Sequence, residues 1–125
     1  ILGMVGCKKE ESVDSDKYKW TWKVYEKCNW ASVSTIYEMK IHQSQGDDIL
    51  VENLGDTFAL TNGQITKDKL YVALDEGKIK DNQGTEYTFF LDPAEFMSQY
   101  QIKFTYKYYI DALDQTECDC EAFKQ

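Results

Sequence analysis

The stretch YQIKFTYKYYI, residues 100–110, has the clearest secondary-structure pattern in the chain. Apolar and aromatic residues occupy every second position, namely Ile102, Phe104, Tyr106, Tyr108 and Ile110. Successive side chains of a β-strand point to opposite faces, so this period of two predicts a long strand with one buried face. The rest of the chain can be compared with this segment.

The same alternation recurs in shorter segments on both sides of this strand. These segments are 18–28, 35–41, 48–55, 57–61, 69–74, 86–91 and 117–124. Polar turns separate them, and no amphipathic stretch has the length of a stable helix. About eight short strands joined by tight turns are typical of an all-β, antiparallel up-and-down barrel; the alternative is a two-sheet β-sandwich.

Three local patterns lead to more specific expectations. Asn62-Gly63 favours a tight hairpin turn, because both central residues of that turn take positive φ. Residues 92–97 (DPAEFM) have the composition of a helix start and predict one helical turn or an ordered loop. Glu26 interrupts the inward-facing row of the first strand, which favours a strand edge or a bulge, with a buried functional acid as the alternative.

The composition is that of one folded domain, which we place at residues 18–125. The 125 residues are 42% hydrophobic and include nine Tyr, six Phe and three Trp, enough for one modest core. The formal net charge of −8 repels phosphate backbones, and no basic stripe is present, so we expect no nucleic-acid partner. No apolar run has the length of a transmembrane helix.

The first residues, ILGMVGC, lead directly into the charged run KKEE. An apolar segment that ends in Gly-Cys before a polar spacer resembles the end of a bacterial lipoprotein signal peptide, with Cys7 as the lipidated residue. We therefore interpret residues 1–7 as the remnant of a signal peptide and 8–17 as a polar spacer. The resemblance implies a lipid anchor in the bacterial outer membrane, on the cell surface or, alternatively, on the periplasmic side.

Three further cysteines lie at the two ends of the folded domain. In an oxidising compartment Cys28 would pair with either Cys118 or Cys120, leaving one thiol over. A bridge between Cys118 and Cys120 is disfavoured, because residues i and i+2 of a strand point the same way and diverge too little. Three cysteines without a nearby histidine form an incomplete zinc site, so we predict no metal. A bridge between the first and last strands would make them neighbours, as in a closed barrel.

Several of these patterns together resemble the small lipocalin-like (calycin-type) lipoproteins of Bacteroidetes-type bacteria. The matching segments are the Trp-rich first strand that ends at Cys28, residues 49–55, residues 102–106, and Cys118 or Cys120 before AFK at 122–124. The resemblance implies a lipocalin-like barrel in a family largely without an assigned biochemical role. This chain differs from the family pattern in having both late cysteines and in the segment 92–97.

The sequence contains no motif of the common catalytic sites. A glycine-rich phosphate loop, a nucleophile elbow and metal-ligand spacing are all missing from the sequence. The one histidine, His42, is expected at an exposed strand end, and the paired acids at 47–48 and 75–76 fall in expected turns. We therefore expect no enzyme activity and no cofactor.

The excess of aromatic residues predicts first of all a filled core, with a cavity that binds a ligand as the functional alternative. The candidates for the lining of an apolar cavity are the inward-facing Trp20, Trp22, Tyr37, Met39, Phe104, Tyr106 and Tyr108, which would otherwise form the core. We expect a non-enzymatic envelope protein that binds a small apolar ligand or is an accessory subunit of an outer-membrane assembly.

Two alternative functions belong to other classes. Small acidic barrels on lipid tethers also resemble inhibitors of basic secreted enzymes such as lysozyme. Exposed aromatic residues could instead bind surface glycans. A barrel filled by its own side chains would argue against the ligand carrier, whereas exposure of Trp20, Trp22 and Trp30 would favour glycan binding.

Overall fold

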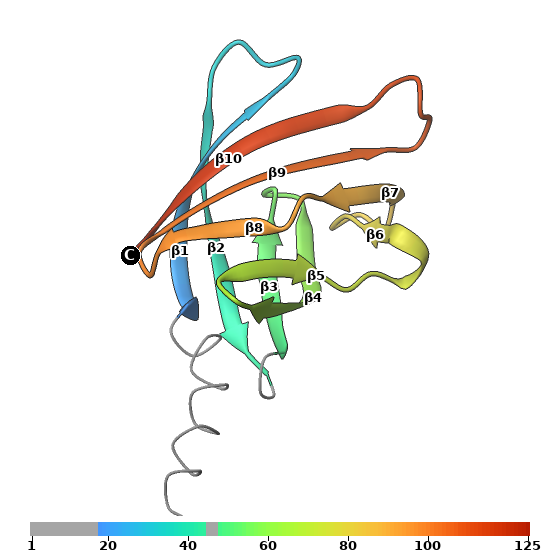
Figure 1. The fold of residues 1–125 in the computed structure, drawn as a ribbon. Helices are drawn as coiled ribbons and strands as arrows, with labels where there is room; N and C mark the ends of the chain where they lie inside the picture. The colour runs from blue at the N-terminus through green and yellow to red at the C-terminus, as the bar shows by residue number, and fades with distance from the viewer. Residues whose placement is uncertain (1–17, 45–47) are drawn as a thin grey trace, which may run out of the picture.

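The computed structural model describes residues 18–44 and 48–125 (Figure 1). Its strands are β1 (Trp20–Cys28), β2 (Thr35–Gln43), β3 (Asp48–Leu54), β4 (Phe58–Thr66), β5 (Lys69–Val72), β6 (Lys78–Lys80), β7 (Glu86–Leu91), β8 (Ala94–Ser98), β9 (Gln101–Tyr109) and β10 (Thr116–Lys124). A short 3₁₀ turn, η1 (Asp75–Gly77), precedes β6. No helix in the described ranges is long and apolar enough to cross a membrane. The expectations for Cys7 and for segments 1–7 and 8–17 lie outside the described residues.

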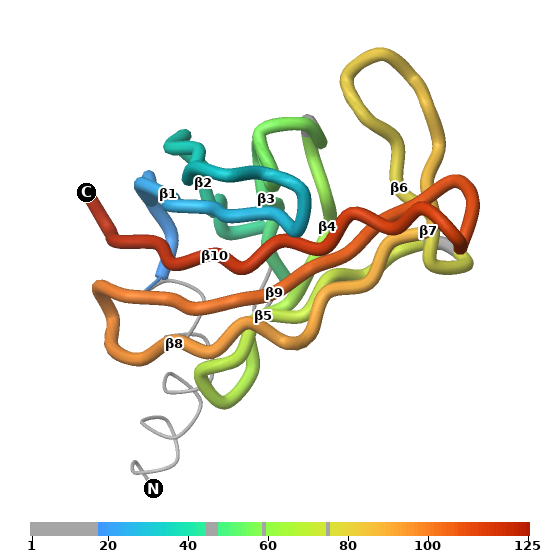
Figure 2. The backbone as a smooth tube through the Cα atoms, turned by 90° about the horizontal axis from the view of Figure 1, so that it is seen from above, coloured from blue at the N-terminus to red at the C-terminus, as the bar shows by residue number. Residues whose placement is uncertain are grey.

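The strands form a closed antiparallel barrel of eight strands, which confirms the predicted fold class. The sheet closes because β1 pairs with both β2 and β10, and β10 also pairs with β9. Figure 2 shows β1, β10 and β9 side by side along this seam. Two of the eight barrel strands are interrupted. One consists of β7 and β8, which both pair with β9. The other consists of β5, which pairs with β8, and β6, which pairs with β7. Closure leaves the barrel without free sheet edges along its seam.

A disulfide joins the first and last strands at this seam. Cys28 lies directly opposite Cys118 in the β1–β10 register, and the two Sγ atoms are 1.95 Å apart. Of the two predicted pairings, the structure therefore has the one with Cys118. Cys120 is a buried free thiol, because its direct partner across the seam is Glu26.

The two ends of the barrel differ in their side chains. We call the end where β1 begins the lower end, and the end with the β1–β2 and β9–β10 hairpins the upper end (Figure 1). The lower end is closed by rings: Tyr18 stacks on Phe96 with ring centroids 3.6 Å apart, and the Trp22 ring lies 5.8 Å from Phe96. Aliphatic side chains and a methionine fill much of the rest of the core, including Met39, Ile41, Ile49, Val51, Ile65, Leu70 and Ile102.

The hairpin turn predicted at Asn62-Gly63 was wrong, because β4 runs straight through both residues. A Cβ on Gly63 would lie 2.5 Å from the carbonyl oxygen of Tyr71. This glycine therefore permits close approach of β5 and does not form a turn. The turn comes later, at Lys67 and Asp68, with φ of 53° and 59°.

The helical turn or ordered loop predicted for residues 92–97 was also wrong, since residues 94–98 form β8. Ala94 and Phe96 alternate with exposed residues and are buried in the core. Asp92 and Pro93 mark the break between β7 and β8, consistent with a residue that cannot donate to the ladder. Burial of Phe96 at the lower end outweighs the local preference for a helix start.

Candidate functional site

Six of the seven residues predicted to line a cavity face the barrel interior, namely Trp22, Tyr37, Met39, Phe104, Tyr106 and Tyr108. The prediction for Trp20 was wrong, because its side chain is 58% exposed. Trp20 has a φ of 136°, which breaks the alternation at the start of β1. Tyr18 is buried at the lower end in its place.

The void that the structure shows among the described core side chains is very small. The void bounded by Met39, Val51, Phe104 and neighbouring apolar side chains measures about 10 Å³. That volume is barely enough for one water, whereas small-molecule sites usually measure about 300–1,000 Å³. The inward-facing residues therefore act as core, except that the partly buried Tyr108 also lines a pocket at the upper end.

Glu26 is a buried acid, so the predicted strand edge or bulge at this position was wrong. It pairs in regular register with Thr35 on one side and Cys120 on the other, and its side chain is 7% exposed. Its Oε1 accepts hydrogen bonds from the hydroxyls of Tyr37 (2.9 Å) and Tyr106 (2.7 Å) and from Cys120 Sγ (3.3 Å). These donors replace the water that a buried carboxylate loses.

The donors around Glu26 keep their protons at neutral pH. Burial, and then the charges of the cluster itself, raise the pKa of Tyr37, Tyr106 and Cys120 far above their ordinary values. Tyr37 also accepts a hydrogen bond from the backbone N–H of Gly55 at 3.0 Å, which ties the β3–β4 turn to the cluster. A buried, protonated thiol is a poor nucleophile, so this chemistry is that of a structural network.

One group of possible metal ligands is present among the described residues. It comprises Glu26, Cys28 and Cys118, whose ligand atoms lie within 4.8 Å of one another. The two sulfur atoms are joined in the disulfide and are not the thiolates that bind metals. In this oxidised form the group offers one carboxylate, which does not make a metal site.

A pocket of about 320 Å³ opens at the upper end of the barrel, and we call it the upper pocket. It is lined by Trp30, Tyr87, Tyr108, Tyr109, Ile110, Asp111, Asp114 and Thr116. These residues come from the β1–β2 hairpin, the start of β7, and the β9–β10 hairpin, which projects beside β7 in Figure 1. Asn29 links the two hairpins through two hydrogen bonds. Its Nδ2 donates to the carbonyl oxygen of Gln115 at 3.1 Å, and its backbone N–H donates to the carbonyl oxygen of Glu117 at 2.9 Å.

The floor of the upper pocket is a ring cluster that continues into the core. The rings of Tyr87 and Tyr108 meet edge to face at 5.1 Å, and Tyr108 stacks on Tyr106 at 6.0 Å. Phe58 contacts both Tyr87 and Tyr108 from below, at 6.1 and 5.4 Å. Rings supported in this way form a firm platform, and Trp30, which is 61% exposed, lies at the rim.

The charged groups of the upper pocket are carboxylates. Asp111 and Asp114 line it, and both are exposed. The hydroxyl of Tyr87 donates to Asp81 Oδ2 at 3.0 Å, which places a third carboxylate nearby. Partial desolvation raises the pKa of Asp81, but hydrogen bonds from the backbone of its own turn and from Tyr87 outweigh it and lower this pKa below the ordinary value. Asp81 is therefore negative at neutral pH.

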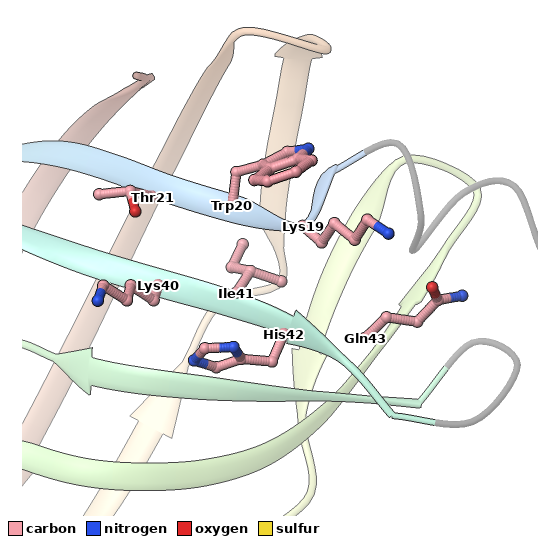
Figure 3. A pocket seen from close by; sticks show the side chains of 7 residues that line it. All are labelled: Lys19, Trp20, Thr21, Lys40, Ile41, His42 and Gln43. Carbon is pink, nitrogen blue, oxygen red and sulfur yellow. The ribbon is translucent and has the colours of Figure 1, made fainter.

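A hollow of about 470 Å³ lies outside the lower end of β1 and β2 (Figure 3). Figure 3 shows Ile41 pointing toward Trp20, whereas the imidazole of His42 points away from it. His42 is exposed near the end of β2, as predicted, and its Nε2 lies 2.9 Å from Glu52 Oε1. Because the aromatic and polar groups do not converge here, the upper pocket is the better candidate site.

The sequence patterns do not predict the upper pocket. They point to Tyr108 only as a lining residue of an interior cavity and to Trp30 only as a test of glycan binding. A signal was nevertheless present, because the pairing of Cys28 with a late cysteine makes the first and last strands antiparallel neighbours. That arrangement places the β1–β2 and β9–β10 hairpins, with their aromatic and acidic residues, at the same end of the barrel.

Comparison with known proteins supports the fold alone. No protein-family model and no curated protein matches the chain. Among solved structures, a redesigned β-barrel is similar, with a TM-score of 0.59 and 14% sequence identity over 90% of this chain and 95% of that chain.

Proposed function

We propose that this protein is a non-enzymatic binding protein of the bacterial envelope, anchored by lipid on Cys7 to the outer membrane and exposed at the cell surface. Its ligand is held in the upper pocket and not inside the barrel. The observation that supports this most is the contrast between about 320 Å³ in the upper pocket and about 10 Å³ in the interior void. An apolar ligand carried inside the barrel would have to displace core side chains.

The chemistry of the upper pocket also supports a binding role. Its lining combines four aromatic side chains with two carboxylates that can accept hydrogen bonds. The acid and the thiol with unusual surroundings, Glu26 and Cys120, are hydrogen-bonded to each other inside the barrel. They belong to the core, away from the exposed rim where a ligand would enter.

The site can be located by NMR on the full-length, ¹⁵N-labelled protein. The probes are three unrelated compounds: a simple saccharide, a medium-chain fatty acid and choline. We expect amide shifts at Trp30, Tyr109 and Asp114 with at least one probe, and loss of these shifts in Trp30→Ala but not in the matched control Trp20→Ala. Shifts confined to interior residues such as Met39 and Phe104 would contradict the proposal, as would the lack of any response in the upper pocket.

The anchor is tested separately, in cells that make the protein with its complete signal peptide. We expect incorporation of radiolabelled palmitate and recovery in the membrane fraction, and loss of both in Cys7→Ser. A Cys120→Ser variant is the matched control, because it removes a different thiol. Unchanged membrane recovery of Cys7→Ser would disprove the lipid anchor without affecting the proposed binding site.

Surface glycan binding is a second candidate function. It is favoured by the exposure of Trp20 and Trp30, 58% and 61%, although Trp22 is fully buried. A saccharide would stack its ring on one of these indoles. In the NMR experiment, a response to the saccharide alone would support this candidate over other ligand classes.

A further inference from the structure

The upper pocket combines aromatic faces with negative charge, and no Lys, Arg or His is among its described lining residues. Aromatic faces carry negative potential and attract cations, most strongly where water is partly excluded. We infer that the upper pocket binds a substituted ammonium cation, that is, an ammonium group carrying alkyl substituents. This inference rests on the proposed function, because it names the ligand class of the same site.

Two lysines on strands beside the pocket, Lys78 and Lys107, make their contacts on the outer wall. Lys78 lies on the outer wall, where its Nζ donates to Thr88 Oγ1 at 2.9 Å. Lys107 also lies outside, with its Nζ 5.5 Å from the centre of the Phe90 ring. The carboxylate of Asp114 has no hydrogen bond to any of the residues 18–44 and 48–125, so it is available to a cation. The pocket therefore keeps the charge of its carboxylates.

The two features of the pocket suit a substituted ammonium better than other ligand classes. A bare metal ion is strongly hydrated and would gain little from rings. A neutral saccharide would gain the ring contacts but no charge interaction. Alkyl groups on a charged nitrogen contact the rings, while the charge lies near Asp111 and Asp114. A volume of about 320 Å³ has room for a trimethylammonium group with a short chain.

The charge requirement is tested by titrating the full-length protein with choline and with 3,3-dimethylbutan-1-ol, a neutral compound of the same shape. We expect choline to bind about tenfold more tightly, with an affinity that falls as salt is added. Equal affinity for both compounds would overturn the inference while leaving the upper pocket as the binding site. Binding of the saccharide at the upper pocket without binding of choline would also overturn the inference and leave the pocket as the binding site. Failure of every probe at the upper pocket would overturn the proposed function as well.

Variants separate the ring contribution from the charge contribution. Trp30→Ala and Asp114→Asn should each weaken choline binding about tenfold, whereas Trp30→Phe should retain most of it. The matched controls are Trp20→Ala and Asp92→Asn, which make the same changes outside the pocket and should leave choline affinity unchanged. If the controls weaken binding as much as the pocket variants, general charge attraction explains the result and the inference fails.

A vesicle experiment identifies the source of the cation. Sedimentation with phosphatidylcholine vesicles is compared with sedimentation with phosphatidylglycerol vesicles, using protein without its lipid anchor. Binding to the choline lipid alone indicates a lipid headgroup, and choline binding without vesicle binding indicates a free ammonium compound; both support the inference. Preference for phosphatidylglycerol would contradict it, because that headgroup is anionic.

Discussion

The lower and upper ends of the barrel use aromatic residues in opposite ways. At the lower end, Tyr18, Trp22 and Phe96 pack on one another and close the barrel. At the upper end, Tyr106 and Tyr108 stack in a column that rises from the buried Glu26 to the open pocket. Aromatic residues therefore close the barrel at one end and line an open pocket at the other, because hydroxyl and carboxylate groups accompany them mainly at the upper end.

The polar cluster explains why the upper end is ordered without being closed. Apolar packing is non-directional, whereas hydrogen bonds require particular atoms at particular distances. The bonds from Tyr37 and Tyr106 to Glu26 fix the rings below the pocket, although such buried polar groups add little net stability. We therefore expect stability to depend most on the disulfide seam and the lower end, and binding to depend on the upper end.

The largest expected effect is loss of the disulfide. Cys28 and Cys118 are separated by 90 residues, and opening a loop of that length should lower the free energy of unfolding by about 4–5 kcal/mol. Urea unfolding of the Cys28→Ala/Cys118→Ala double variant measures this loss, with Cys120→Ala as the control that keeps the bridge. A loss below about 1 kcal/mol would mean that strand pairing alone holds the seam.

A direct comparison of the two ends comes from two tryptophans. Trp22→Ala should cost about 3–5 kcal/mol, because the lower end cannot close over the lost ring. Trp30→Ala should cost about 0.5 kcal/mol or less, since Trp30 is mostly exposed. Urea unfolding of both variants provides the test. Similar losses in the two variants would refute the distinction between Trp22 as a core residue of the lower end and Trp30 as a rim residue of the upper pocket.

Alkaline pH should act selectively on the upper end. Burial raises the pKa of Tyr37 and Tyr106 above 10.0 and that of Cys120 above 9.0, so the folded protein keeps protons that the unfolded chain loses. Stability should thus be constant below about pH 8 and then fall, with a loss of about 2 kcal/mol by pH 10. Urea unfolding at a series of pH values measures how steeply the free energy of unfolding falls with pH. This fall should be shallower in Tyr37→Phe. A slope that is unchanged in Tyr37→Phe would exclude this tyrosine as a source.

The smallest expected effect is a gain in stability at Thr61. This residue is 3% exposed, and among the described residues its Oγ1 has no hydrogen-bond partner. Thr61→Val keeps the shape and removes the unsatisfied hydroxyl, which should raise the free energy of unfolding by about 1 kcal/mol. Thr57→Val is the matched control. It should lower the free energy of unfolding, because Thr57 Oγ1 donates to the Gly55 carbonyl at 3.0 Å. A destabilised Thr61→Val would indicate that the hydroxyl has a partner, such as a buried water.

The sequence was sufficient to predict the β-barrel and most of its inward-facing residues. Alternation with a period of two is a local property of each strand, and it was clearest in β9. The cysteines near both ends of the domain added one long-range fact, that the first and last strands are neighbours. Closure of the sheet follows from these two kinds of information.

Local signals failed where packing outweighed them. Asn62-Gly63 resembles a hairpin turn, but Gly63 is needed for the close approach of Tyr71. Residues 92–97 resemble a helix start, but Phe96 completes the lower end. In each case the deciding contact comes from a residue that is not adjacent in sequence.

The sequence alone specifies the class of fold and, for most strands, the face that turns inward. Only the tertiary structure decided that the interior is full, that Glu26 is buried with three donors, and that the upper pocket exists. Alternation specifies a direction for each side chain but no volume. Whether eight inward rows fill the barrel or leave a cavity depends on how all of them pack together, and the upper pocket depends on how two distant hairpins meet.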